Sequence, residues 1–175
     1  MHFKDCFSLR DCDITDRILV KCVKGLCNVR VVDLSGNYIT HSGWRALADH
    51  LRSNRDNSRM TELVFQSSRH AIDQQAGEQL ARIFSALNRL DLRRSVLTDE
   101  AVHSFIKVIC ERKTEKGMEK LDLTGCGFSK SSLEEFEEIN RRKGSSLVMV
   151  GAFDDIESAK RGVSVSGCWR CLCCS

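Results

Sequence analysis

Apolar residues recur with the same spacing in five segments of the chain. Each segment follows the pattern L-x-L-x-x-(N/C/S)-x-L, so its first two apolar residues are separated by one residue. Such alternation is typical of a short strand that is buried on one face. The unit recurs about every 28 residues. The segments cover residues 7–14, 32–39, 63–72, 90–97 and 121–128, and the third closes two residues late.

The residue that follows each segment is of a type that begins helices. Ser, Thr and Asp side chains accept hydrogen bonds from the unpaired N–H groups of a first helical turn. These residues are Thr15, Thr40, Asp73, Thr98 and Ser129. Beyond them, apolar residues recur every four positions, which indicates a helix with one apolar face. The positions expected to face inward are Ile18, Cys22 and Leu26; Gly43, Leu47 and Leu51; Ala76, Leu80 and Phe84; Ala101, Phe105 and Ile109; and, less regularly, Ser132, Phe136 and Asn140.

A strand followed by a capped helix, five times over, predicts an α/β fold built by stacking. No single unit can bury its own apolar stripe, but neighbouring units can cover one another. We expect parallel strands on the concave side of a solenoid and helices on its convex side. The sixth position of each segment should point inward and satisfy backbone groups where the chain leaves the strand. That position holds Cys12, Asn37, Ser68, Ser95 and Cys126.

Over roughly residues 3–139, this pattern resembles the ribonuclease-inhibitor type of leucine-rich repeat. The resemblance implies a right-handed solenoid shaped like a segment of a horseshoe. The same repeats occur in cytosolic NOD-like receptors and in Ran GTPase-activating protein, so they imply protein binding without naming the partner. Ribonuclease inhibitors hold basic partners with acidic and aromatic concave residues. This chain has no aromatic residue in those rows, which argues against ribonuclease inhibition.

The repeat pattern predicts a leucine-rich-repeat domain over residues 1–150 and a flexible tail over residues 151–175. The apolar run 147–150 predicts one more strand that covers the open end of the array. The polar stretches 52–59 and 111–117 predict solvated loops. Lys4 stands where the later units have an apolar residue, so the chain begins inside a unit. This is what a shortened form of a larger repeat protein would show.

Composition narrows the function. The chain has 27 basic and 24 acidic residues, a balance that gives no reason to expect a nucleic-acid partner. No apolar run is long enough to span a membrane, and the start lacks the apolar stretch of a signal peptide. We therefore expect a cytoplasmic protein whose 10 cysteines are mostly reduced thiols.

The sequence contains no recognisable catalytic, metal or cofactor motif. The patterns G-x-x-x-x-G-K, H-E-x-x-H, G-x-S-x-G and G-x-G-x-x-G are all missing. None of the five histidines pairs predictably with a cysteine nucleophile. We expect no enzyme, no cofactor and no resident metal.

A concave binding face is the strongest functional candidate. Arg93 and Arg94 form a basic spot that can anchor an acidic partner, because guanidinium groups bind carboxylates in bidentate fashion. The alternative is that Asp91 and Asp122 neutralise this pair. The residues predicted to contact a partner are Arg10, Asp33, Ser35, Val64, Gln66, Asp91, Arg93, Arg94 and Asp122.

The tail carries a second candidate site. Its four thiols could bind zinc, but they lie too close together for the usual two separated pairs. A prenylation box requires cysteine fourth from the end, where Leu172 stands. S-acylation beside Trp169 fits better, and a tail without a role is the remaining alternative. The thiols are Cys168, Cys171, Cys173 and Cys174.

These features predict a non-enzymatic intracellular module that binds a protein through its concave strand face. Two alternatives are a regulator of a GTPase or another enzyme that acts through the same face, and an adaptor tethered to a membrane by its acylated tail.

Overall fold

The computed structural model describes residues 5–111, 118–142 and 148–150. Along these residues, strands and helices alternate, and a single 3-10 turn, η1 (Ile83–Ser85), extends the third helix. The strands are β1 (Cys6–Ser8), β2 (Val31–Asp33), β3 (Glu62–Val64), β4 (Arg89–Asp91), β5 (Lys120–Asp122) and β6 (Val148–Val150). The helices are α1 (Asp16–Leu26), α2 (His41–Ser53), α3 (Gln74–Arg82), α4 (Asp99–Glu111) and α5 (Lys130–Arg142).

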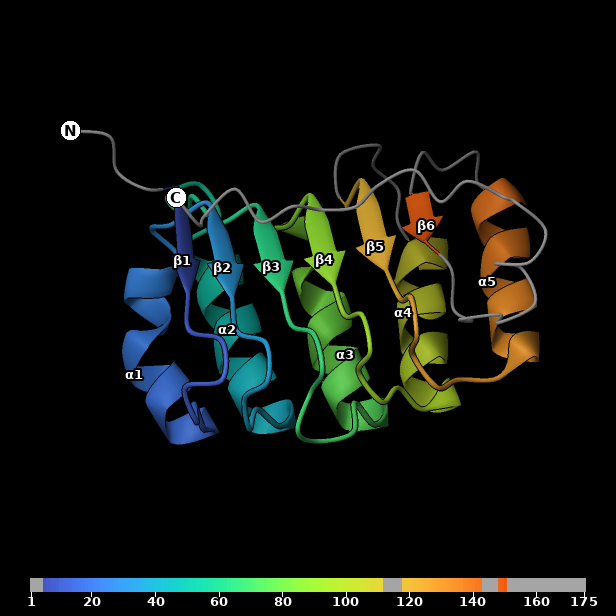
Figure 1. Cartoon of the computed structure of the whole chain (residues 1–175). Coiled ribbons are helices and arrows are strands. Elements are labelled where there is room, and N and C mark those ends of the chain that lie inside the picture. The colour runs from blue at the N-terminus through green and yellow to red at the C-terminus, as the bar shows by residue number, and fades with distance from the viewer. Residues whose placement is uncertain (1–4, 112–117, 143–147, 151–175) are drawn as a thin grey trace.

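The strands form one parallel sheet in sequence order, from β1 to β6. Figure 1 shows them side by side in one layer, with the helices together in a second layer. The expected alternation of strand and helix is therefore confirmed as an α/β fold with a parallel sheet. The final strand predicted from residues 147–150 is β6, which pairs with β5.

The register matches the sequence pattern. The first apolar residues of the five segments are aligned across the sheet at Phe7, Val32, Leu63, Leu90 and Leu121. All of them are buried except Phe7, which lies on the first strand. The second apolar residues from β2 onward are also buried against the helices, at Leu34, Phe65, Leu92 and Leu123.

Aromatic rings fill the space between the layers. Trp44 from α2 meets Phe65 edge to face, with ring centroids 4.5 Å apart. Phe84 of η1 lies 5.2 Å from Phe105 of α4. In each pair the two rings come from neighbouring units, so these contacts bind the units together, as stacking requires.

Four of the five predicted N-caps make the expected side-chain bond. The oxygens of these side chains accept from backbone N–H groups in the first turn of the helix that follows: Thr40, Asp73, Thr98 and Ser129. The prediction is wrong for Thr15, whose side chain makes no capping hydrogen bond before α1.

The inward face of α1 also differs from the prediction. Ile18 is 43% exposed, and Leu19 and Val23 are buried in place of Ile18 and Cys22. Among the described helices, α1 packs only against α2, whereas α2, α3 and α4 each lie between two others. The buried stripe of α1 is thus shifted by one residue from the predicted one. Having one neighbouring helix does not explain the shift, because α5 also packs against one helix, α4, and buries Ser132 and Phe136 as predicted. The inward positions predicted for α2, α3 and α4, continuing into η1, are confirmed.

The sixth position of the segment points inward in three of the five units. Asn37, Ser95 and Cys126 are buried, and each bonds to backbone groups of the preceding unit. The prediction is wrong for Cys12 and Ser68. Cys12 has no preceding unit among the described residues, and its thiol donates to the carbonyl of Arg10 in the same turn. Ser68 instead donates to the carbonyl of His70, because the two extra residues of this unit bring that group within reach.

Residues 54–61 join α2 to β3, so the loop predicted at 52–59 is confirmed except for its first two residues, which belong to the last turn of α2. Residues 112–117 and the tail, with its four candidate thiols, lie outside the described residues, so the predictions made for them stay predictions. No helix of the described residues is long and apolar enough to cross a membrane.

Candidate binding surface

The side chains that point away from the helices form what we call the open sheet face. Its central row consists of the residues between the paired apolar positions, which are aligned across five strands. Strand alternation directs this row away from the core. The row is Ser8, Asp33, Val64, Asp91 and Asp122.

Three aspartates in the central row have a local structural role. Asp33, Asp91 and Asp122 each accept a hydrogen bond from the backbone N–H two residues further on, at 2.9, 3.1 and 3.2 Å. Ser8 accepts the same bond at 3.4 Å, and Val64 has no acceptor to offer. This hydrogen bond between the side chain and the backbone two residues further on stabilises the turn at the end of the strand. The aspartates are therefore not placed there for a partner alone.

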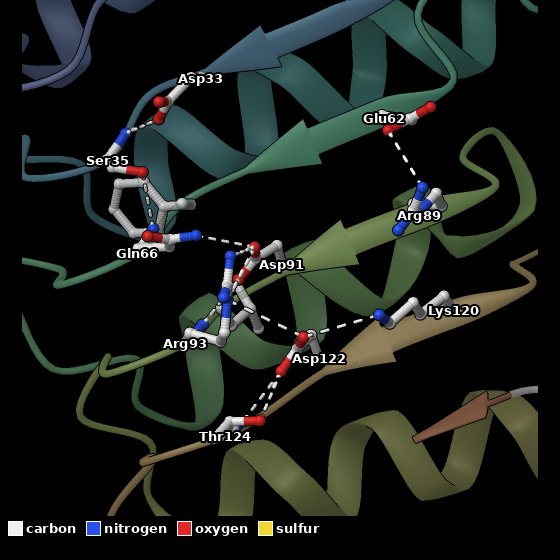
Figure 2. A network of polar contacts seen from close by, with 12 residues as sticks. Asp33, Ser35, Glu62, Gln66, Arg89, Asp91, Arg93, Lys120, Asp122 and Thr124 are labelled. Carbon is white, nitrogen blue, oxygen red and sulfur yellow. Dashed lines mark hydrogen bonds and ion pairs between the residues drawn. The ribbon is translucent and has the colours of Figure 1, made fainter. Parts of the chain in front are cut away.

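Arg93 lies between two of these carboxylates. Its Nη2 donates to Asp91 Oδ2 at 2.7 Å, and its Nε lies 3.8 Å from Asp122 Oδ2. Lys120 and Thr124 also contact the Asp122 carboxylate. The hydrogen bond to Asp91 and the nearby negative charges together hold the pKa of Arg93 above its ordinary value. Of the two alternatives for this arginine, the structure supports neutralisation by Asp91 and Asp122 (Figure 2).

Gln66 extends the network to the earlier strands. Its Nε2 donates to Asp91 Oδ2 at 2.7 Å, and its backbone N–H donates to Ser35 Oγ at 3.0 Å. Arg10 reaches in from the first unit, donating to Gln66 Oε1 and to Asp33 Oδ2, both at 3.2 Å. Figure 2 shows the part of this network that runs from Asp33 through Gln66 and Arg93 to Asp122. We call this chain of contacts the polar ladder: Arg10, Asp33, Gln66, Asp91, Arg93 and Asp122.

A second row of charges runs beside the ladder. Glu62 on β3 lies between Arg30, at 2.8 Å, and Arg89 of the next strand, at 3.8 Å. Cations and carboxylates thus alternate over the open sheet face. Such exposed pairs contribute little to stability and can exchange partners.

The nine predicted contact residues do not all remain accessible. Ser35 is 1% exposed and Asp122 is 5% exposed, so neither offers much surface to a partner. Val64 is half-buried in the central row, in register with Asp33 on one side and Asp91 on the other. Arg94 lies apart from the ladder, on the turn after β4, and is exposed.

Sequence reasoning missed a row of left-handed turns. The residue two positions after the second apolar residue has a positive φ in all five units, between 51° and 71°. Glycine occupies only two of these positions, although it is the residue that adopts this conformation without steric cost. The two glycines at matching positions were the signal that could have revealed it. We call this the turn row: Asp11, Gly36, Ser67, Arg94 and Gly125.

Within the described ranges, no three metal-ligating side chains lie close enough together to hold an ion. Burial raises the pKa of Cys27 to about 11 and that of Cys126 to about 12. Both are therefore protonated thiols at neutral pH, and the thiolate is the form that reacts. The chemistry this surface offers is reversible binding by ion pairs and hydrogen bonds.

A scan of the chain against protein-family models finds no matching family, and a search of curated proteins finds no match.

Proposed function

We propose that this protein is a leucine-rich-repeat module of the ribonuclease-inhibitor type, with a right-handed solenoid, that binds another protein through its open sheet face. In this proposal the open sheet face is the concave side of the solenoid. The module acts without catalysis and inside the cell.

The polar ladder is the observation that carries the proposal. It crosses five units, and its exposed members come from segments that are far apart in the sequence. Its side chains are fixed by one another before any partner arrives. Prior ordering lowers the entropy cost of binding, because fewer rotamers are lost on contact.

The balance of charge on this face suggests how it recognises a partner. Each cation of the ladder is already paired with a carboxylate. A partner whose surface carries charge of only one sign therefore gains little binding energy from this face. It must instead match the positions of alternating charges around Val64. Complementarity of this kind favours specificity over affinity.

A photo-reactive amino acid placed at position 64 tests the proposal. After irradiation in cell extract, the variant should form one reproducible cross-linked product with another protein. Unlabelled wild-type protein should compete this product away, whereas a competitor carrying Gln66→Ala and Arg10→Ala should not. The same label at Lys107, which is exposed on α4, is the matched control.

Thermal melts of the competitor should show a folded protein with a modest loss of stability, about 1–2 kcal/mol, because the contacts of Arg10 are exposed and the Gln66–Asp91 bond is half-buried. A competed product formed from position 107 and not from position 64 would place binding on the helices and overturn the proposal.

A further inference from the structure

The turn row brings five loops together at the edge where the chain leaves the sheet. Backbone hydrogen bonds run from each of the first four turns to the next unit: Asp11 N to Ser35 O, Gly36 N to Gln66 O, Ser67 N to Arg93 O and Arg94 N to Thr124 O. Their lengths are 2.9, 2.9, 3.1 and 2.9 Å. Successive turns are therefore about one strand spacing, or about 4.8 Å, apart.

Arg94 is unusual in this row. Its φ of 57° lies in the left-handed region, where a long side chain is disfavoured. Gly36 and Gly125 occupy the equivalent turns of the second and fifth units. A strained residue in place of glycine is a reason to look for a function.

Arg94 also differs from the other cations of the strands and their exits. Arg10, Arg89, Arg93 and Lys120 each have an ion-pair partner. Arg94 is exposed, and it forms no ion pair with any residue that the structure describes. Its charge is thus available to an incoming anion.

A second basic group lies two turns away. Arg69 donates from Nε to the carbonyl of Gly36 at 3.1 Å, and its guanidinium lies 5.7 Å from the centre of the Tyr38 ring. His70 packs edge-on against the same ring, at 5.9 Å. Asp11 is the anionic partner of Arg69, at 3.3 Å between groups that are about half exposed. The exposed pair is open to exchange with another carboxylate.

Apolar surface accompanies these cations. Tyr38 is 38% exposed and Val96 is 58% exposed, and both lie on the strand exits of the second and fourth units. Arginine and tyrosine are the residue types that most often dominate binding energy at protein interfaces. We call this surface the rim site: Tyr38, Arg69, His70, Arg94 and Val96.

We propose that the rim site binds an acidic segment of a protein partner, with carboxylates on Arg94 and Arg69 and apolar side chains against Tyr38 and Val96. The second and fourth turns are about two strand spacings, or about 10 Å, apart, which an extended segment spans in about three residues. The inference rests on the proposed protein-binding function, because it names the chemistry of the partner.

The probe for the test is a short labelled peptide rich in glutamate with interspersed leucine, followed by fluorescence anisotropy. It should bind the wild-type protein, and binding should weaken as salt is added. The same peptide with every glutamate replaced by glutamine should bind at least tenfold more weakly.

Arg94→Gly is the decisive variant, because it removes the guanidinium and also relieves the left-handed strain. It should weaken peptide binding about tenfold while raising the melting temperature. Ser67→Gly is the matched control, since it relieves the same strain in the adjacent turn and should leave binding unchanged. A residue with only a structural role would not separate stability from binding in this way.

Three outcomes would overturn the rim site. Arg94→Gly could bind the peptide as tightly as wild type does, or wild type could bind the glutamine peptide as tightly as the glutamate peptide. Inorganic phosphate or anionic vesicles could displace the labelled peptide as well as the unlabelled peptide does. Loss of the position-64 cross-link with retained peptide binding would overturn the sheet-face function and leave the rim site standing. A position-64 cross-link that forms without any peptide binding would overturn the rim site alone.

Discussion

Asp99, in the first turn of α4, accepts a 2.7 Å hydrogen bond from the backbone N–H of Ser129, the residue that precedes α5. The Ser132 hydroxyl donates to the same carboxylate oxygen at 2.9 Å. Asp16 of α1 makes the equivalent contact with Thr40 before α2, at 2.8 Å. In both places, the first turn of one helix holds the beginning of the next, so these carboxylates connect neighbouring units.

The Asp99 contact makes stability depend on pH. The backbone bond from Ser129, followed by the bond from Ser132, holds the pKa of Asp99 below its ordinary value. A carboxylate with a lowered pKa stabilises the fold at neutral pH, and this contribution is lost as the pH falls through the folded-state pKa. We expect Asp99→Ala to cost about 1–2 kcal/mol at pH 7.

The measurement is urea unfolding of wild type and Asp99→Ala at a series of pH values. The difference between their unfolding free energies should become smaller in acid, because only the wild type has an Asp99 carboxylate to protonate. Equal differences at pH 7 and in acid would mean that the Asp99 charge does not contribute.

The strand register predicts a sharp contrast between neighbours on β4 and its exit. Leu92 is fully buried, so Leu92→Asp places an unpaired carboxylate in the core and should cost about 3 kcal/mol or more. Asp91→Leu removes the bonds to Gln66 and Arg93 from a half-buried position, and should cost about 1–2 kcal/mol. Thermal melts that rank the two in the opposite order would contradict the register.

Asn37 should be among the most sensitive polar positions. Its Oδ1 accepts from the N–H groups of Cys12 and Ile14, and its Nδ2 donates to the carbonyls of Leu9 and Leu34. Asn37→Ala leaves these buried groups without partners, so we expect a loss of about 3 kcal/mol in unfolding free energy. The control is the equivalent substitution Ser68→Ala, where the side chain is turned away from the core and the change should stay within about 0.5 kcal/mol.

Gly77 of α3 lies close against the backbone of α4. A β-carbon at this position would lie 2.7 Å from the Cα of Ala101, which is backbone and cannot move aside. We expect Gly77→Ala to destabilise by about 1–3 kcal/mol. Gly25 in α1 has no atom within 4 Å of such a carbon, so Gly25→Ala should be neutral or stabilising, because alanine favours helix. Calorimetric melts of the two variants test this, and an equal effect on the melting temperature would contradict the close packing at Gly77.

Thiol reactivity should follow burial. Cys12 is exposed, whereas burial raises the pKa of Cys27 to about 11 and that of Cys126 to about 12. Brief treatment of the native protein with iodoacetamide at pH 8 should modify Cys12 and spare the other two. Peptide mass spectrometry measures this, with urea-unfolded protein as the control in which all three react. Rapid native modification of Cys126 would show that the fifth unit opens readily.

The repeating architecture could be predicted from the sequence because its signals are local. Alternation of apolar residues marks each strand, a short polar residue marks each helix start, and four-residue spacing marks the buried faces of α2, α3 and α4. These features concern residues close in the chain, and their recurrence specifies stacking. The alignment of Val32, Leu63, Leu90 and Leu121 across the sheet follows the sequence pattern residue by residue.

What depended on neighbours in space had to come from the tertiary structure. From the sequence, neutralisation of Arg93 by Asp91 and Asp122 was one of two open alternatives, and the structure decided it because the Asp122 contact joins two units. The sequence could not show that Ser35 is buried and accepts from the backbone of Gln66 in the next unit. The one-residue shift of the buried stripe of α1, to Leu19 and Val23, also emerged only from the packed structure. The left-handed turn at Arg94 escaped detection because the backbone bond to Thr124 in the next unit, and not a local glycine, supports it. Spacing along the chain therefore determined the repeat, while pairing between units determined which charges remain available to a partner.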